Sequence, residues 1–159
     1  MAKIPSVALV LEALLKHVQE SDAPYGISTN LPARTVTGST GLPKDNWGHP
    51  FWVTPRSYGA SAGFRSVPVR SPIAVVTVWG LPTDAKRFWG STENLALDLM
   101  ELGTDWVTNV TLNMPYAGYR AVTISGFTPL SDAPRRVEGD PTGLARVEFD
   151  VRLTYDTKE

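Results

Sequence analysis

The sequence predicts an α+β domain: a mainly antiparallel twisted sheet, two helices packed on one face of it, and long loops. Three patterns support this fold class. Residues 144–155 alternate apolar and polar side chains, which is typical of a half-buried strand. Residues 73–79, Ile-Ala-Val-Val-Thr-Val-Trp, are nearly all β-branched or aromatic, which indicates an interior strand. Two other segments carry apolar residues at helical spacing.

The first helix is expected over residues 6–20. Ser6 can cap it, because its hydroxyl can accept a free backbone N–H of the first turn. Apolar residues then recur at three- and four-residue steps and share one face, whereas Glu12 is expected on another face. Pro24 ends the helix, because proline disfavours helical geometry in the residue before it.

Short strands and long connections follow this helix. Alternating side chains predict a strand over residues 25–31, and residues 51–54 predict another that Pro55 closes. Residues 32–49 are rich in Gly, Pro, Thr and Asn and have no apolar period, so they are expected to form a long loop. Residues 58–70 contain two glycines and a proline and are expected to form a second long connection or a hairpin.

The second helix is expected to begin at Ser91 or Thr92 and to end at Leu102. Its apolar residues recur at helical spacing, and Gly103 stands where a terminating glycine is common. Trp89 comes directly before this segment and is expected to pack the start of the helix against the sheet.

The remaining strands are expected near the end of the chain. Residues 106–112 and 119–127 carry weaker strand patterns. In residues 144–155, the odd-numbered positions are apolar and are expected to face the core. The charged positions between them are expected to face solvent or a polar partner surface. These charged positions are Arg146, Glu148, Asp150 and Arg152.

Composition limits the function classes. A chain of 159 residues with 42% hydrophobic residues predicts one domain over residues 1–159. The absence of cysteine excludes disulfides, thiolate metal sites and cysteine nucleophiles. A net charge of −1 argues against a protein that holds nucleic acid through its phosphates. No membrane segment is expected, since the longest apolar stretch, residues 7–15, is short and contains Glu12.

The sequence carries no recognisable catalytic or metal-binding motif. His17 and His49 lack a second histidine at ligand spacing, and no nucleophile-elbow, zinc-protease or phosphate-loop motif occurs. We therefore expect no catalytic residue, metal or cofactor. Asp132 and Asp140 flank a pair of arginines, which leaves open a small enzyme or ligand-binding domain that uses this segment. We favour a solvated loop with local ion pairs.

Aromatic and charged residues suggest interaction surfaces instead. Trp79 is expected in the core, whereas Trp47 lies in the long loop and is an interface candidate. Arg56, Arg65 and Arg70 could form a basic patch; they leave open a nucleic-acid-binding module, although we rank pairing between subunits above it. The candidate interface residues are Arg34, Trp47, Arg56, Tyr58, Arg65, Arg135, Arg136, Asp140, Arg146, Glu148, Asp150 and Arg152.

Four stretches of the chain together resemble the tail terminator proteins of long-tailed, siphovirus-type bacteriophages, particularly those of actinobacterial hosts. The first is Ile-Pro-Ser at residues 4–6, with its helix and the strand at residues 26–32. The second is the strand at residues 75–80, and the third is Trp-Gly-Ser-Thr-Glu-Asn-Leu-Ala at residues 89–96. The fourth runs from Arg-Arg-Val at residues 135–137 to Asp140 and into the last strand.

The resemblance implies a structural virion protein without catalysis. Such proteins form a homo-oligomeric ring, expected to be a hexamer, that caps the tail tube, stops tube polymerisation and offers a docking surface to head–neck connector proteins. The expected partners are other copies of the chain, the tail tube protein and the connector, with DNA only passing through the lumen. The expected location is the tail or neck of the virion, after assembly in the host cytoplasm. The long loops at residues 32–49 and 57–70 depart from the family pattern and leave open another neck or head–tail connector component.

Overall fold

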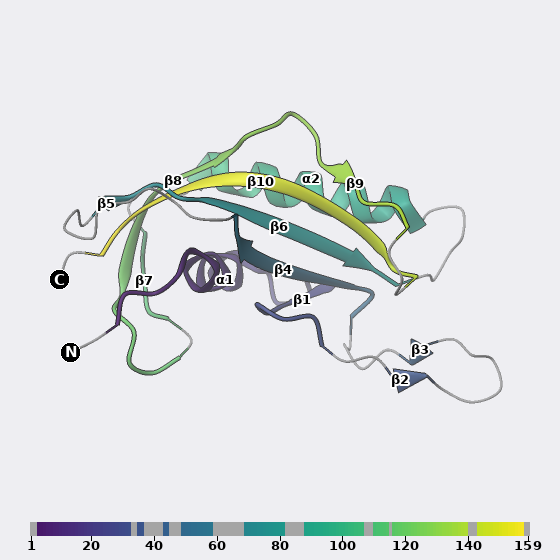
Figure 1. The fold of residues 1–159 in the computed structure, drawn as a ribbon, viewed down its shortest axis with the longest axis horizontal. Helices are drawn as coiled ribbons and strands as arrows, with labels where there is room; N and C mark the ends of the chain where they lie inside the picture. Colours follow the sequence, from purple (N-terminus) through teal and green to yellow (C-terminus); the bar gives the residue numbers. More distant parts are fainter. Residues whose placement is uncertain are drawn as a thin grey trace.

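The computed structural model describes residues 3–32, 35–36, 43–44, 49–58, 69–81, 88–106, 110–114, 116–139 and 143–157. Its helices and strands follow one another along the chain as Figure 1 labels them. The elements are α1 (Val7–Val18), β1 (Tyr25–Ile27), β2 (Thr35–Val36), β3 (Pro43–Lys44), β4 (Phe51–Ser57), β5 (Val69–Arg70), β6 (Ile73–Gly80), α2 (Phe88–Trp106), β7 (Val110–Leu112), β8 (Val122–Pro129), β9 (Arg135–Arg136) and β10 (Ala145–Asp156).

The main sheet has eight strands, in the order β1-β4-β6-β10-β8-β7, with β5 and β9 also paired to β10. Only the pair β1–β4 is parallel; the other pairs of this sheet are antiparallel. The long strand β10 lies in the middle, with β6 and β5 along one edge and β8 and β9 along the other. A separate small ladder joins β2 and β3.

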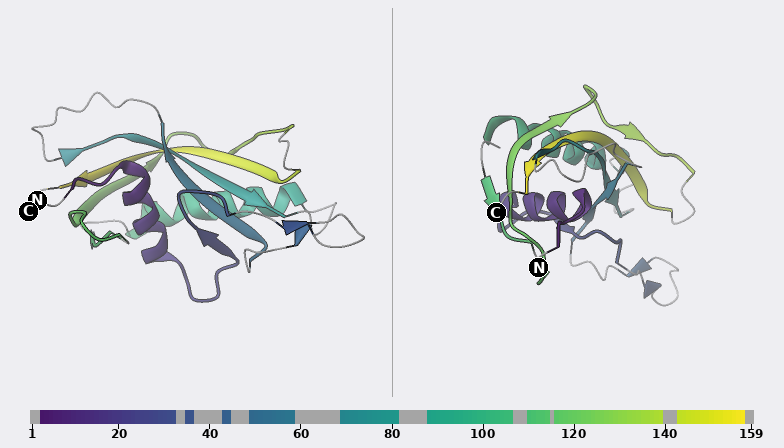
Figure 2. Two further views of the ribbon diagram at one scale, coloured as in Figure 1. Left: turned by 60° about the horizontal axis from the view of Figure 1, so that its bottom comes forward. Right: turned by 60° about the vertical axis from the view of Figure 1, so that its left-hand side comes forward.

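Both helices pack on the same, inner side of this curled sheet, as Figure 2 shows. One apolar core contains Leu11 and Leu14 of α1, Leu99 of α2, Val76 of β6 and Phe149 of β10. The α+β class expected from the sequence, with two helices on one face of a mainly antiparallel sheet, is therefore confirmed. No helix within the described ranges is long and apolar enough to cross a bilayer.

The two sides of the sheet follow from strand alternation. In β10, the odd-numbered residues from Ala145 to Tyr155 are all buried, as their apolar character predicts. The even-numbered residues from Arg146 to Arg152 point to the outer side, away from both helices. The register pairs Val151 with Ala74 and Phe149 with Val76, so each inner position of β10 faces an inner position of β6.

The first helix differs from its prediction in one important residue. α1 begins after Ser6, whose hydroxyl accepts a hydrogen bond from the Leu9 amide at 3.4 Å, as expected of its cap. Glu12, however, is completely buried, whereas the apolar stripe predicted it on another face. Strands β1, β4, β6 and β7 all contact α1, so the sheet meets more of this helix than one apolar stripe. The Lys16 ammonium lies 3.0 Å from a Glu12 carboxylate oxygen.

The bounds of α2 and β4 also differ from the predicted ones. α2 begins at Phe88, before the predicted Ser91, and runs through Gly103 to Trp106. Strand β4 continues through Pro55 to Ser57 instead of ending there. The partner strand β1 pairs only as far as Val53, so Pro55 lies where β4 has become an edge and the missing N–H breaks no ladder bond.

The strands predicted around the second helix and the last loop are shorter or shifted. The predicted strand at residues 25–31 is reduced to β1, and that at residues 106–112 to β7, because Trp106 still belongs to α2. The strand predicted over residues 119–127 is displaced to β8.

Candidate functional site

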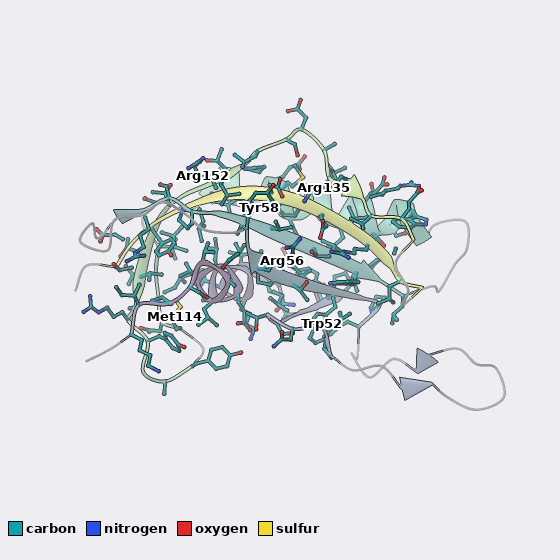
Figure 3. All side chains as sticks on the ribbon, in the orientation of Figure 1. Trp52, Arg56, Tyr58, Met114, Arg135 and Arg152 are labelled. Atoms are coloured by element: carbon teal, nitrogen blue, oxygen red, sulfur yellow. The ribbon has the colours of Figure 1, made fainter. Side chains whose placement is uncertain are left out.

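The outer side of the sheet carries a continuous charged surface. We call it the arginine face, and Figure 3 shows four of its labelled side chains over β4, β6 and β10. Strand alternation puts these side chains there, since β4 and β10 present their even-numbered residues outward. The arginine face consists of Arg56, Tyr58, Arg135, Arg146, Glu148, Asp150 and Arg152.

Glu148 is the buried centre of the arginine face. Its side chain is only 6% exposed, although the sequence predicted an open charged position. Thr77, its cross-strand partner on β6, donates a hydrogen bond from Oγ1 to Glu148 Oε2 at 2.9 Å. Arg146 Nη2 donates to the same oxygen at 3.0 Å. The carboxylate is therefore covered by its own hydrogen-bond donors, which satisfy a buried charge.

Two further arginines reach Glu148 from other strands. Arg56 Nη2 of β4 lies 3.5 Å from Glu148 Oε2, and Arg135 Nη2 of β9 lies 3.3 Å from Glu148 Oε1. The same Arg135 nitrogen donates to Asp150 Oδ1 at 3.0 Å. Glu148 of β10 thus connects four strands, since its partners lie on β4, β6, β9 and β10. The side chains of Arg56, Arg135 and Arg146 remain 53%, 46% and 28% exposed.

These contacts shift the pKa values of the cluster. Burial acts to raise the pKa of Glu148, but the Thr77 and Arg146 hydrogen bonds and the charges of Arg146 and Arg56 outweigh it, so the pKa lies below its ordinary value. The hydrogen bond to Asp150, opposed by burial, raises the pKa of Arg135, and the charges of Asp150 and Glu148 add to this. Both shifts favour the charged forms of Glu148 and Arg135 at neutral pH.

Aromatic side chains frame the arginine face. The guanidinium of Arg146 lies 5.3 Å from the ring centroid of Trp79, and Trp79 Nε1 donates to Thr54 Oγ1 at 2.9 Å. Trp79 was predicted in the core; it does not lie in the main core between sheet and helices but on the outer side, partly buried against Leu81 and Leu144. Strand parity contained the signal, because Trp79 shares its side of β6 with Thr77.

A second tryptophan extends this frame to the edge of the sheet. Trp52 Nε1 donates to Ser28 Oγ at 2.9 Å. Its ring covers Gly26 of β1, where an added Cβ would lie 2.2 Å from the ring. Glycine at this position is therefore what lets the indole lie flat across the edge strand.

Arg135 and Arg136 are adjacent in sequence but lie on opposite sides of the sheet. They belong to strand β9, so their side chains alternate. Arg136 Nε donates to Glu93 of α2, and its guanidinium lies 5.3 Å from the ring centroid of Trp89. That hydrogen bond raises the pKa of Arg136. Arg136 therefore ties β9 to the start of α2 and is not part of the arginine face.

The structure brings together some of the predicted interface residues and not others. Arg56, Tyr58, Arg135, Arg146, Glu148, Asp150 and Arg152 share the arginine face. The predicted patch of Arg56 with Arg70 is not formed, because Arg70 lies in β5 opposite the buried Tyr155. Four predicted residues lie outside the described ranges, namely Arg34, Trp47, Arg65 and Asp140.

Most charged groups of the arginine face are paired with one another among the described residues. Among them, no group of three or more His, Asp or Glu side chains could hold a metal ion. The carboxylates of Glu148 and Asp150 are occupied by arginines, and Arg152 Nη1 donates to the Ser71 carbonyl at 3.0 Å. A scan against protein-family models and a search of curated proteins found nothing that matches the chain.

Proposed function

We propose that this chain is a structural virion protein that forms a ring on the end of a phage tail tube, stops tube polymerisation and offers a docking surface to the head–neck connector. The observation that carries the proposal is the arginine face. It is a fixed, charged and partly aromatic surface on the side of the sheet that neither described helix covers.

The fixed geometry of the arginine face suits an interface. Arg56, Arg135 and Arg146 are held by Glu148 and Asp150, and Arg152 by the Ser71 carbonyl, before any partner arrives, so less side-chain freedom is lost on binding. Its residue types also suit a protein partner. Every cation in it is arginine, and Trp79 and Tyr58 lie beside them, while protein interfaces are enriched in Arg, Trp and Tyr and depleted in Lys.

In a head-to-tail ring, each subunit uses one surface to contact a different surface of the next subunit. Head-to-tail rings form when one patch of a subunit contacts a different patch of the next and the rotation closes. A two-layer domain, with a charged sheet on one side and helices on the other, supplies two such patches. The family resemblance of the sequence then assigns the ring to the tail tube; another neck component would use the same surfaces against a different partner.

Tube growth tests this function. The purified chain is added to its cognate tail tube protein while tubes are growing, and tube lengths and ends are recorded by electron microscopy. We expect growth to stop and a ring to appear at one end of each tube. The Val151→Asp chain, which should not fold, is the matched control for added protein. Tubes that reach their usual lengths with bare ends contradict the proposal.

A further inference from the structure

The arginine face has an excess of positive charge. It contains four arginines, Arg56, Arg135, Arg146 and Arg152, against the two carboxylates of Glu148 and Asp150, an excess of two charges. The whole chain nevertheless has a net charge of −1. The rest of the chain therefore carries a net charge of −3, since −1 minus the +2 of the arginine face is −3.

The helix side of the domain carries exposed carboxylates. Glu20 and Asp22 follow α1, and Asp98 lies on the outward surface of α2; all three are exposed. Gln19, the neighbour of Glu20, donates a hydrogen bond to the Tyr25 carbonyl, so the end of α1 lies beside β1. Burial raises the pKa of Tyr25, and the charges of Glu20 and then Asp98 raise it further. We call Glu20, Asp22 and Asp98 the acidic helix side.

Cations of the helix side are already paired with other carboxylates. Lys16 forms its ion pair with the buried Glu12, and Arg136 forms its own with Glu93. In the described part of the chain no ion pair involves Glu20, Asp22 or Asp98. Among the described residues, the arginine face is therefore net positive, and Glu20, Asp22 and Asp98 give the helix side carboxylates that no ion pair neutralises.

We propose that the arginine face of one copy of this chain docks on the acidic helix side of the next copy. The inference rests on the proposed ring and names the two surfaces that would build it. The sheet separates the surfaces, so one copy cannot satisfy both by itself, whereas a succession of copies can. Complementary charges of this kind steer association and fix the register of two partners.

The details of the arginine face favour a protein partner over nucleic acid. Glu148 and Asp150 lie among the arginines and would repel phosphates, but they present no obstacle to a partner that carries both signs of charge. Arginine also makes the planar, two-pronged contact with carboxylates that lysine cannot make. Asp and Glu side chains of another copy match this chemistry.

Two complementary variants test the pairing. The first, Arg56→Ser with Arg152→Glu, alters only the arginine face; the second, Asp22→Lys with Asp98→Lys, alters only the acidic helix side. Lys3→Glu, a charge reversal at an exposed residue of neither surface, is the control. Thermal melting checks that each variant folds, and Arg152→Ser and Asp98→Asn are milder substitutes if one does not. Native mass spectrometry then measures assembly.

We expect rings from the wild-type chain and from the control, and at least tenfold weaker self-association from each variant alone. In an equimolar mixture, the intact arginine face of one variant can dock on the intact acidic helix side of the other, so we expect the mixture to associate more strongly than either variant alone. The inference is overturned if either variant assembles as strongly as the wild-type chain. It is also overturned if the wild-type chain binds DNA in a salt-dependent way, and the first variant alone loses this binding but still assembles.

The wild-type chain separates this inference from the proposed function. If wild-type chains remain monomers at the highest concentration and on tail tubes, the two surfaces have no affinity and the inference fails. If such monomers still cap tubes and stop their growth, the proposed function stands without it. If wild-type rings form and cap tubes but both variants do so equally well, only the assignment of the two surfaces fails.

Discussion

The two sides of strand β10 show how one strand serves two purposes. Val151 on the inner side has no exposed surface and packs with both helices in the apolar core. Arg152, the next residue, is exposed and donates to the Ser71 carbonyl on the outer side. The inner side stabilises the fold by removing apolar surface from water, whereas the outer side holds charges in a fixed arrangement. Substitutions on the inner side should therefore affect folding, and substitutions on the outer side should affect assembly.

The largest effect is expected on the inner side. Val151→Asp places a carboxylate in the fully apolar core, and no cation of the described core faces it. We expect a loss of about 4 kcal/mol or more in the free energy of unfolding, enough to leave the chain unfolded. Circular dichroism should show no cooperative melting transition. A soluble variant that melts cooperatively would mean that the inner side of β10 is wrongly assigned.

A smaller effect is expected at the buried centre of the outer side. Glu148→Gln keeps the shape of the side chain but removes the charge that Arg56, Arg135 and Arg146 share. We expect a loss of about 1–3 kcal/mol, because hydrogen bonds to a charged group are lost while the exposed arginines can turn to water. Urea unfolding measures it. A loss as large as that of Val151→Asp would show that the outer side also controls folding.

Acid should weaken the same cluster. The pKa of Glu148 is lower in the folded chain than in the unfolded chain, so the folded state binds this proton less tightly. The resulting stabilisation is complete above the unfolded pKa, about 4.3, and is lost as pH falls through the folded pKa. Urea midpoints between about pH 6 and pH 3 should fall more steeply for the wild-type chain than for Glu148→Gln. Parallel curves would contradict this pKa shift.

Glu12 is a buried charged residue on the otherwise apolar inner side, and replacing it with an apolar residue should stabilise the fold. Its carboxylate is completely buried, and the half-exposed Lys16 is its charged partner among the described residues. Glu12→Leu lets the lysine return to water and places an apolar side chain in an apolar site, so we expect a gain of about 1 kcal/mol. Lys16→Met should instead destabilise the chain, since it leaves Glu12 buried without a cation. Melting temperatures that shift in the same direction for both variants would contradict this reading.

The smallest effect on stability is expected at the exposed residue beside Val151. Arg152→Ser removes one hydrogen bond to the Ser71 carbonyl and leaves the core untouched. We expect a change of about 0.5 kcal/mol or less, measured by urea unfolding. The comparison with Val151→Asp is then direct, because the two positions are adjacent in one strand. A change above about 2 kcal/mol would mean that the outer contacts also stabilise the fold.

The elements that the sequence predicts best are those whose pattern reports directly on burial. The alternation in β10 and the β-branched run of β6 placed both strands to within one residue, and Ser6 marked the start of α1. The second helix was harder. Glycine often follows the last turn of a helix, but a helix interior can also accommodate it, and α2 continues through Gly103 to Trp106.

Only part of the arginine face could be predicted from the sequence. Parity within β10 grouped Arg146, Glu148, Asp150 and Arg152 correctly, because that grouping is local. The pairing of β10 with β9 and β6 is not local, so neither the burial of Glu148 nor its contact with Arg56 could be predicted. The opposite orientations of Arg135 and Arg136 could not be predicted either, because residues 135–136 carry no strand pattern of their own and become a strand only by pairing with β10.

Labelling of a single introduced thiol tests the central claim, that the arginine face is buried between subunits. The chain has no cysteine, so Tyr58→Cys on the arginine face and Tyr116→Cys elsewhere each add one reactive site. Tyr58 and Tyr116 are 54% and 47% exposed, which makes them a matched pair. We predict that a maleimide labels both variants as monomers, but that only Tyr58→Cys is protected in the assembled ring. Equal labelling of Tyr58→Cys in the monomer and in the ring would contradict the account.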